Sequence, residues 1–159
     1  NYDPLLLDKG ANPAGDVLIR LPHAPFEEAE DYPAMQKFID LMDARKEKDD
    51  QTKTAALGIQ SMSSWLLFTQ AATACGSTGD KVISRDCIRE QVGEIGEWTG
   101  GGLHAPTNPG ENLPPKCVIV MTVDGDKFVR KFPEVGSDDA TDDGYYCPEE
   151  NAVVDIDVE

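Results

Sequence analysis

The sequence predicts an α/β layered architecture, and three observations lead to this expectation. Short apolar runs bounded by glycine or proline are typical of strands. Longer stretches with apolar residues at helical spacing lie between them. Near the C-terminus, Asp124-Gly125 is a strong turn signal between two apolar runs and predicts a β-hairpin. The order of strand, helix, strand, two helices, loop and hairpin fits packed layers, with the hairpin placed apart from the helices.

The first strand is expected over 16–21, between Ala14-Gly15 and Pro22. A helix follows Pro33, because apolar residues recur there with the spacing of an amphipathic helix that fades into the charged run 45–50. The residues that set this spacing are Met35, Phe38, Ile39 and Met42.

A second strand is expected over 54–57, running directly into an almost wholly apolar helix over 61–75 with Gly76 as its C-terminal cap. Such a helix must be covered on nearly every side. The strand-to-helix junction could admit an anionic ligand, with Gly58 allowing close approach to the backbone, or it could be a plain tight turn capped by Ser61 or Ser63.

A third helix is expected from Ser84 as N-cap through Ile88, Val92 and Ile95, ending where the glycines begin. The hairpin strands are expected over 117–123 and 127–132. The sequence contains no internal repeat.

Composition excludes several partners. The chain has 159 residues, 40% of them apolar, which predicts a globular domain rather than general disorder. Its formal charge of -16 would repel nucleic acid and anionic lipid, so neither is expected as a partner. The longest apolar stretches fall far short of the roughly 20 residues that span a bilayer. The absence of an initiating Met and of a signal peptide suggests a mature or cut piece.

The four cysteines lack CxxC spacing, which gives a zinc site poor support. Three disulfide pairings are open, and the local order favours Cys75 with Cys87 and Cys117 with Cys147. An oxidising, exported location follows as a hypothesis. The alternative is a cytosolic protein with buried free thiols.

Chemistry-bearing motifs are scarce. The sequence has no GxSxG elbow, HExxH motif, phosphate loop or recognisable carboxylate pair, so no catalytic residue, metal ligand or cofactor is predicted. His23 and His104 are each isolated in sequence and are expected to be hydrogen-bonded structural histidines. A hydrolase with an unrecognised site is the alternative, although no nucleophile and base can be named.

The acidic segment 139–150 offers a further alternative. Asp139, Asp143, Gly144 and Glu150 match positions 1, 5, 6 and 12 of a calcium loop, which would suit a structural or adhesion module. Thr141 and Pro148 fit that pattern poorly, and the flanks lack helical periodicity. A solvated loop tied down by Cys147 is the preferred interpretation.

One resemblance covers nearly the whole chain, from about residue 1 to 147. The most specific segment is Trp-Thr-Gly-Gly-Gly-Leu-His-Ala-Pro-Thr-Asn-Pro at 98–109. The supporting segments are Ala-Leu-Gly-Ile-Gln-Ser at 56–61, Trp-Leu-Leu-Phe at 65–68, Ala-Cys-Gly at 74–76, Arg-Asp-Cys at 85–87, Cys117 and Phe-Val-Arg at 128–130. Together they resemble the C-terminal part of type I periplasmic solute-binding proteins, above all the branched-chain amino acid receptors of actinobacterial ABC transporters.

The resemblance implies a two-lobed fold with three chain crossings, of which only the C-terminal portion is present. On this pattern, 1–21 end one lobe and form a crossing, 22–99 belong to the other lobe, 100–116 form a hinge crossing, and 117–159 hold the hairpin and an acidic, disulfide-tied tail. The glycines supply backbone freedom and the prolines limit it, which favours a hinge over a catalytic loop. The expected hinge residues are Pro22, Gly100, Gly101, Gly102 and Pro106.

The resemblance also implies a function without chemistry: binding of a small amino-acid-like ligand and its delivery to an ABC permease. Gln60, Ser61, Met62 and His104 are the expected ligand contacts in this chain. The main clamp for the ligand would lie upstream of Asn1, in the remaining part of the receptor, which would also cover the apolar helix. The expected location is extracellular or in the cell envelope, as a lipoprotein or periplasmic protein.

Overall fold

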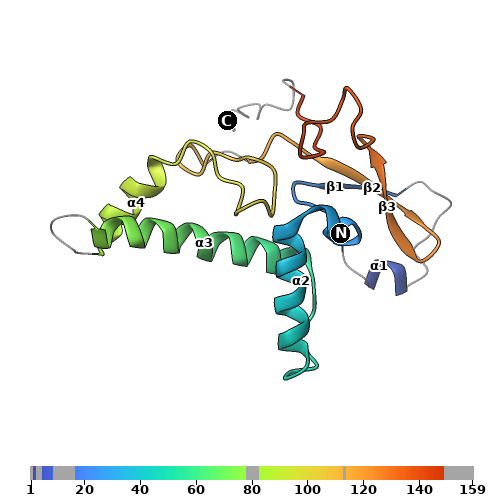
Figure 1. The fold of residues 1–159 in the computed structure, drawn as a ribbon, viewed down its shortest axis with the longest axis horizontal. Coiled ribbons are helices and arrows are strands. Elements are labelled where there is room, and N and C mark those ends of the chain that lie inside the picture. The colour runs from blue at the N-terminus through green and yellow to red at the C-terminus, as the bar shows by residue number, and fades with distance from the viewer. Residues whose placement is uncertain (1, 3–4, 9–16, 78–82, 113, 149–159) are drawn as a thin grey trace, which may run out of the picture.

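The computed structural model describes residues 2, 5–8, 17–77, 83–112 and 114–148 (Figure 1). A small sheet lies at one end of the molecule and the helices α3 and α4 lie at the other, with α2 beside the end of α3 that is nearer the sheet. In chain order the elements are α1 (Leu5–Asp8), β1 (Leu18–Leu21), the 3-10 helix η1 (Phe26–Asp31), α2 (Pro33–Lys46), α3 (Ala56–Ser77), α4 (Arg85–Gly93), β2 (Ile119–Asp124) and β3 (Lys127–Phe132).

The sheet has three antiparallel strands in the order β1-β2-β3. Leu18 pairs with Thr122 in the first ladder, and Asp124 pairs with Lys127 beside the hairpin turn in the second. The predicted hairpin is therefore confirmed. The predicted first strand is confirmed from residue 18, while Asp16 lies outside the described residues. The two-lobed receptor fold is not tested by this sheet and stays a prediction.

Two of the predicted helices begin where their sequence signals indicated. Pro33 occupies the first turn of α2, where its missing N–H costs no hydrogen bond. The side chain of Ser84 accepts a hydrogen bond from the backbone N–H of Cys87, as expected of an N-cap. The helix α4 ends at Gly93, so that Ile95, which was expected inside it, lies beyond its end.

The predicted strand over 54–57 is wrong. The helix α3 already begins at Ala56 and continues through Gly76 to Ser77. A short apolar run is compatible with either a strand or a helix, and here it joins the apolar positions that follow it. Consequently no strand leads into α3. A Cβ added at Gly58 would lie 2.9 Å from Cζ of Phe38, so the space expected for a ligand is filled by the core of this chain.

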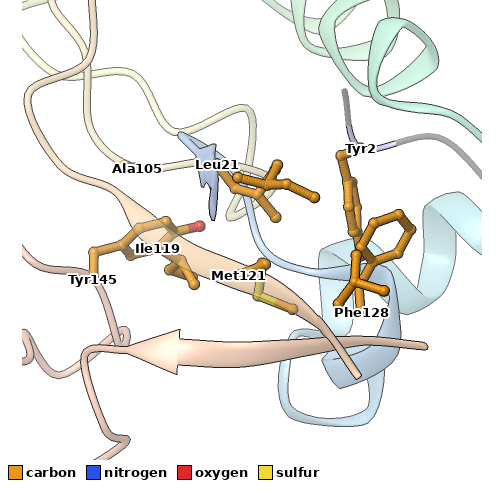
Figure 2. Packing of buried hydrophobic residues seen from close by; sticks show 9 residues of the cluster. Tyr2, Leu21, Ala105, Ile119, Met121, Phe128 and Tyr145 are labelled. Atoms are coloured by element: carbon orange, nitrogen blue, oxygen red, sulfur yellow. The ribbon is translucent and has the colours of Figure 1, made fainter. Parts of the chain in front are cut away.

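Two clusters of buried side chains hold the described structure together. The sheet core gathers Tyr2, Ile19, Leu21, Ala105, Ile119, Met121, Val123, Phe128 and Tyr145 (Figure 2). The helix core gathers Ala24, Ala29, Met35, Phe38, Ile59 and Leu103. Phe26 and Tyr32 pack against both clusters, which places η1 and its end at the junction between sheet and helices.

Both predicted disulfides are present. Cys75 and Cys87 join α3 to α4, with their Cα atoms 6.0 Å apart, and Cys117 is bonded to Cys147. No free cysteine occurs among residues 2, 5–8, 17–77, 83–112 and 114–148. Two disulfides are typical of proteins from an oxidising, exported compartment, which agrees with the predicted location at this coarse level.

The helix α3 has no charged residue along its 22 positions. It leaves Leu57 77%, Trp65 66% and Phe68 46% exposed. Most of its hydroxyl groups donate hydrogen bonds to backbone carbonyls one turn earlier in the helix. For example, the Thr69 hydroxyl donates to the Trp65 carbonyl at 2.7 Å. The described residues therefore leave part of the apolar surface of α3 exposed, although the sequence predicted a helix covered on nearly every side.

Candidate functional site

A cavity of about 460 Å³ lies between α3 and the segment that follows α4. The helix contributes Ile59, Gln60, Ser63, Ser64 and Leu67. The remaining walls come from Pro22, His23, Val92, Trp98, His104, Thr107, Pro109, Asn112 and Pro115. None of these lining residues is acidic, and none is lysine or arginine. The cavity therefore offers apolar walls and neutral polar groups.

A chain of hydrogen bonds joins three elements at this cavity. The indole Nε1–H of Trp98 donates to Oγ of Ser63 at 2.9 Å. Oγ of Ser63 and Nε2 of His104 lie 2.7 Å apart, and Nδ1 of His104 lies 2.8 Å from the carbonyl oxygen of Ala105. Because a carbonyl can only accept, Nδ1 carries the proton of the neutral ring. Nε2 then accepts from the Ser63 hydroxyl, and each polar atom in this hydrogen-bond network has a partner.

The pKa of His104 lies below its ordinary value because burial disfavours the imidazolium form. The hydrogen bond to the Ala105 carbonyl opposes this shift. The neutral ring that the hydrogen-bond pattern requires is thus also the form that the surroundings favour at neutral pH. Ser63, 6% exposed, is correspondingly held by two partners in the middle of α3.

Short antiparallel pairings position the segment that carries Trp98 and His104. The backbones of Trp98 and Thr107 exchange two hydrogen bonds of 2.8 and 3.0 Å. The segment then pairs with 22–24: the Ala105 N–H donates to the Pro22 carbonyl at 2.8 Å, and the Ala24 N–H donates to the Leu103 carbonyl at 3.2 Å. The predicted hinge residue Pro22 is therefore bonded to the predicted hinge crossing 100–116 beside the cavity.

A turn at 100–102 lies between these pairings, and its backbone geometry requires glycine at position 100. Gly100 has φ 65°, in the left-handed region that glycine adopts without strain. A Cβ there would lie 2.9 Å from Oγ of Ser63 and 3.0 Å from Nε2 of His104. The backbone can approach the hydrogen-bond chain this closely only without a side chain.

Gly101 and Gly102 also have positive φ, 75° and 98°, and face a second cavity of about 440 Å³. Acidic side chains line part of that cavity, namely Asp31, Asp142 and Asp143. Pro106 lies in the paired segment next to Ala105 and is partly buried. The predicted hinge residues thus lie in the turn at 100–102 and in the pairing that follows it, and their motion stays a prediction.

The expected ligand contacts separate into two groups. Gln60 and His104 line the cavity together. Ser61 is exposed elsewhere on α3, and Met62 packs against the helix core, so neither lines the cavity. Sequence reasoning missed Ser63, for which a signal existed: it is a polar residue one turn from Ile59 and one turn from Leu67 on the same face of the helix.

The pairing of Ser63 with His104 resembles one part of a nucleophilic site, a hydroxyl bonded to a neutral imidazole. Two features argue against that use. The Oγ of Ser63 already accepts from Trp98, and Gly100 packs directly against it. The contacts fit a hydrogen-bond network that shapes the cavity wall.

The acidic segment shows no calcium site in its described part. Within residues 2, 5–8, 17–77, 83–112 and 114–148, no group of three His, Cys, Asp or Glu side chains could hold a metal. Glu150, the expected twelfth position, lies outside the described residues. Carbonyl groups of the segment are engaged internally, since Asp143 accepts from Tyr32 at 3.0 Å and Gly144 accepts from Arg130 at 2.8 Å.

Along the part of the chain that the structure describes, no helix is both long and apolar enough to cross a membrane. Comparison with known proteins identifies no relative: no family model matches the chain, and no curated protein or solved structure is significantly similar to it.

Proposed function

We propose that this chain is the C-terminal part of an extracytoplasmic solute receptor that delivers a small amino-acid-like ligand to an ABC permease. The observation that carries the proposal is the cavity beside the paired segments 22–24 and 103–105, which the expected contacts Gln60 and His104 both line. The two disulfides suit a periplasmic or surface-anchored receptor.

The chemistry of the cavity limits which part of a solute it would hold. Its polar atoms at Ser63, Trp98 and His104 bond to one another, and no charged side chain lines the wall. An uncharged part of the solute therefore fits here. The charged α-ammonium and α-carboxylate groups would be bound by the rest of the receptor.

The proposed mechanism is closure about the paired segments 22–24 and 103–105. A ligand shifts such an equilibrium only by binding the closed form more tightly than the open form. The glycine turn at 100–102 and the two backbone hydrogen bonds between the segments are where small changes in φ and ψ would reorient the flanking elements.

The test uses Trp98 as its reporter. In a Trp65→Phe background Trp98 is the only tryptophan, because the chain has two. Its emission and the thermal midpoint are measured with a panel of amino acids and small amides at about 10 mM, where even a site with a Kd of about 1 mM is mostly filled. The proposal predicts a saturable change with one chemical class, weakened by Gln60→Ala and unaffected by Ser61→Ala. Failure of every panel member to alter either signal would refute ligand binding by this cavity.

A further inference from the structure

The only two histidines of the chain face each other at the edge of the cavity. His23 and His104 form an isolated antiparallel bridge between the two paired segments. The flanking backbone hydrogen bonds, from Ala105 to Pro22 and from Ala24 to Leu103, hold the two positions opposite each other. Any charge placed on both rings would therefore act directly on this pairing.

The two rings share one hydrogen-bond pattern. Nδ1 of His23 lies 2.9 Å from the Ala24 carbonyl, and Nδ1 of His104 lies 2.8 Å from the Ala105 carbonyl. Each neutral ring keeps its proton on Nδ1, so a second proton must go to Nε2. In His104 this is the atom that accepts from Ser63. Protonation would make Nε2 a donor and force the Ser63 hydroxyl hydrogen to turn elsewhere.

Within the described residues, no acidic side chain lines the cavity beside the two rings. The helix α3, packed against His104, carries no charged residue, and the charged form of His104 disfavours a charge on His23. Tyr2, whose ring lies 5.6 Å from His23, is the titratable neighbour on the other side, and its hydroxyl donates to Glu27. An imidazolium at either position would therefore be poorly solvated and would repel a second one.

We propose that His23 and His104 form an acid-sensitive latch: protonation of the pair loosens the bond between segments 22–24 and 103–105 and reshapes the cavity. As a device for releasing solute, the latch rests on the proposed receptor function. As a structural transition, it depends on this chain alone.

The direction of the effect follows from burial. Burial lowers the pKa of both histidines below the ordinary value of 6.5, and for His23 the neighbouring His104 lowers it further. At neutral pH both rings are uncharged in the folded and unfolded chains. As pH falls below 6.5 the unfolded chain takes up protons first, so the folded, latched state loses stability.

The latch is tested in the Trp65→Phe protein between about pH 7.5 and pH 5, the range in which histidine changes charge. Because the Nε1–H of Trp98 donates to Ser63, rearrangement of this network should shift the Trp98 emission to the red. We expect a midpoint below 6.5. His104→Gln, which retains an acceptor for Ser63, should abolish the transition, and His23→Gln, which removes the second charge of the pair, should weaken it. The His104 ring resonances, followed by NMR, should titrate with the same midpoint.

Two results would overturn the latch: an emission change that persists unaltered in His104→Gln, or histidine resonances that titrate independently at their ordinary pKa.

Solute titrations at about pH 7.5 and at about pH 5 separate this proposal from the receptor function. With a latch the dissociation constant rises by up to about tenfold per pH unit for each coupled proton. A solute that binds equally at both pH values supports the receptor and refutes the latch. A pH transition in Trp98 without binding of any solute supports the latch and refutes solute binding by this cavity.

Discussion

Arg130 and Glu28 form an ion pair that ties β3 to η1 between residues far apart in sequence. The guanidinium Nε donates to Oε1 of Glu28 at 2.9 Å, while Nη1 donates to the Gly144 carbonyl at 2.8 Å and Nη2 to the Tyr32 hydroxyl at 3.2 Å. One side chain thus joins the sheet, the 3-10 helix and the acidic loop.

Replacing Arg130 by Ala should destabilise the protein by about 3–5 kcal/mol, because it leaves Glu28 largely buried without its counter-charge. The control is Arg45→Ala. Arg45 pairs with Asp49 on the surface of α2, where 64% of the Arg45 side chain is exposed, and its loss should cost less than about 1 kcal/mol. Urea denaturation measures both. Equal losses for the two variants would contradict the assigned role of the ion pair.

Gly100→Ala should destabilise the fold more than Gly101→Ala. Both positions have positive φ, so each alanine carries a backbone cost of about 1–2 kcal/mol. Only the Cβ at position 100 would also press on Ser63 and His104, whereas nothing lies within 4 Å of a Cβ at 101. Denaturant midpoints and Trp98 emission should show the difference. Indistinguishable variants would mean that the close approach at Gly100 does not constrain the fold.

Ser63→Ala should cost about 1–3 kcal/mol, since it leaves the Trp98 Nε1–H and the His104 Nε2 without their partner. Ser64→Ala is the matched control, because Ser64 is exposed and its hydroxyl donates to the Gln60 carbonyl within its own helix. We expect a change below about 0.5 kcal/mol for this control. Thermal and urea melts of the two neighbours provide the comparison. If Ser64→Ala were the costlier change, the hydrogen-bond chain would not stabilise the site.

Ser63 should not behave as an enzymatic nucleophile. Its Oγ is held by Trp98 and covered by Gly100, which leaves little freedom to attack a substrate. Intact-protein mass spectrometry after treatment with a fluorophosphonate should show no adduct at neutral pH. An adduct lost in Ser63→Ala would revive the hydrolase alternative.

Removal of either disulfide should lower stability, and the loss should be larger for the bond that closes the longer loop. The bonds Cys75–Cys87 and Cys117–Cys147 span 12 and 30 residues. The chain-entropy model assigns them about 3 and about 4 kcal/mol. Paired alanine replacements, followed by chemical denaturation, test this order. A larger loss for the first pair would indicate that contacts between α3 and α4, rather than chain entropy, dominate its effect.

Local sequence signals predicted several elements well. The hairpin followed from Asp124-Gly125, and the start of α4 followed from Ser84, because turns and caps depend on a few adjacent residues. The disulfide pairing followed from the order of the cysteines. The strand expected over 54–57 failed because four residues cannot distinguish a buried strand from the first turn of a helix.

The candidate site was harder to predict because its contacts are long-range. His104 and Gln60 were anticipated, but the partner of His104 is Ser63, which lies in a different element and more than forty residues upstream. The hydrogen bond from Trp98 to Ser63 and the ion pair of Arg130 with Glu28 also join residues that are far apart in the sequence. Periodicity identifies the face of a helix but not the segment that will pack on it.

The uncharged face of α3 also bears on how the protein behaves in concentrated solution. At neutral pH the net charge of -16 keeps copies apart and offsets the attraction between exposed Trp65, Phe68 and Leu57 side chains. Acidification towards about pH 4, where carboxylates take up protons, removes that repulsion but leaves the apolar face unchanged. Colloidal stability should therefore decline steeply in acid, and replacing Trp65 and Phe68 by glutamine, which shrinks the apolar face without relying on charge, should restore it.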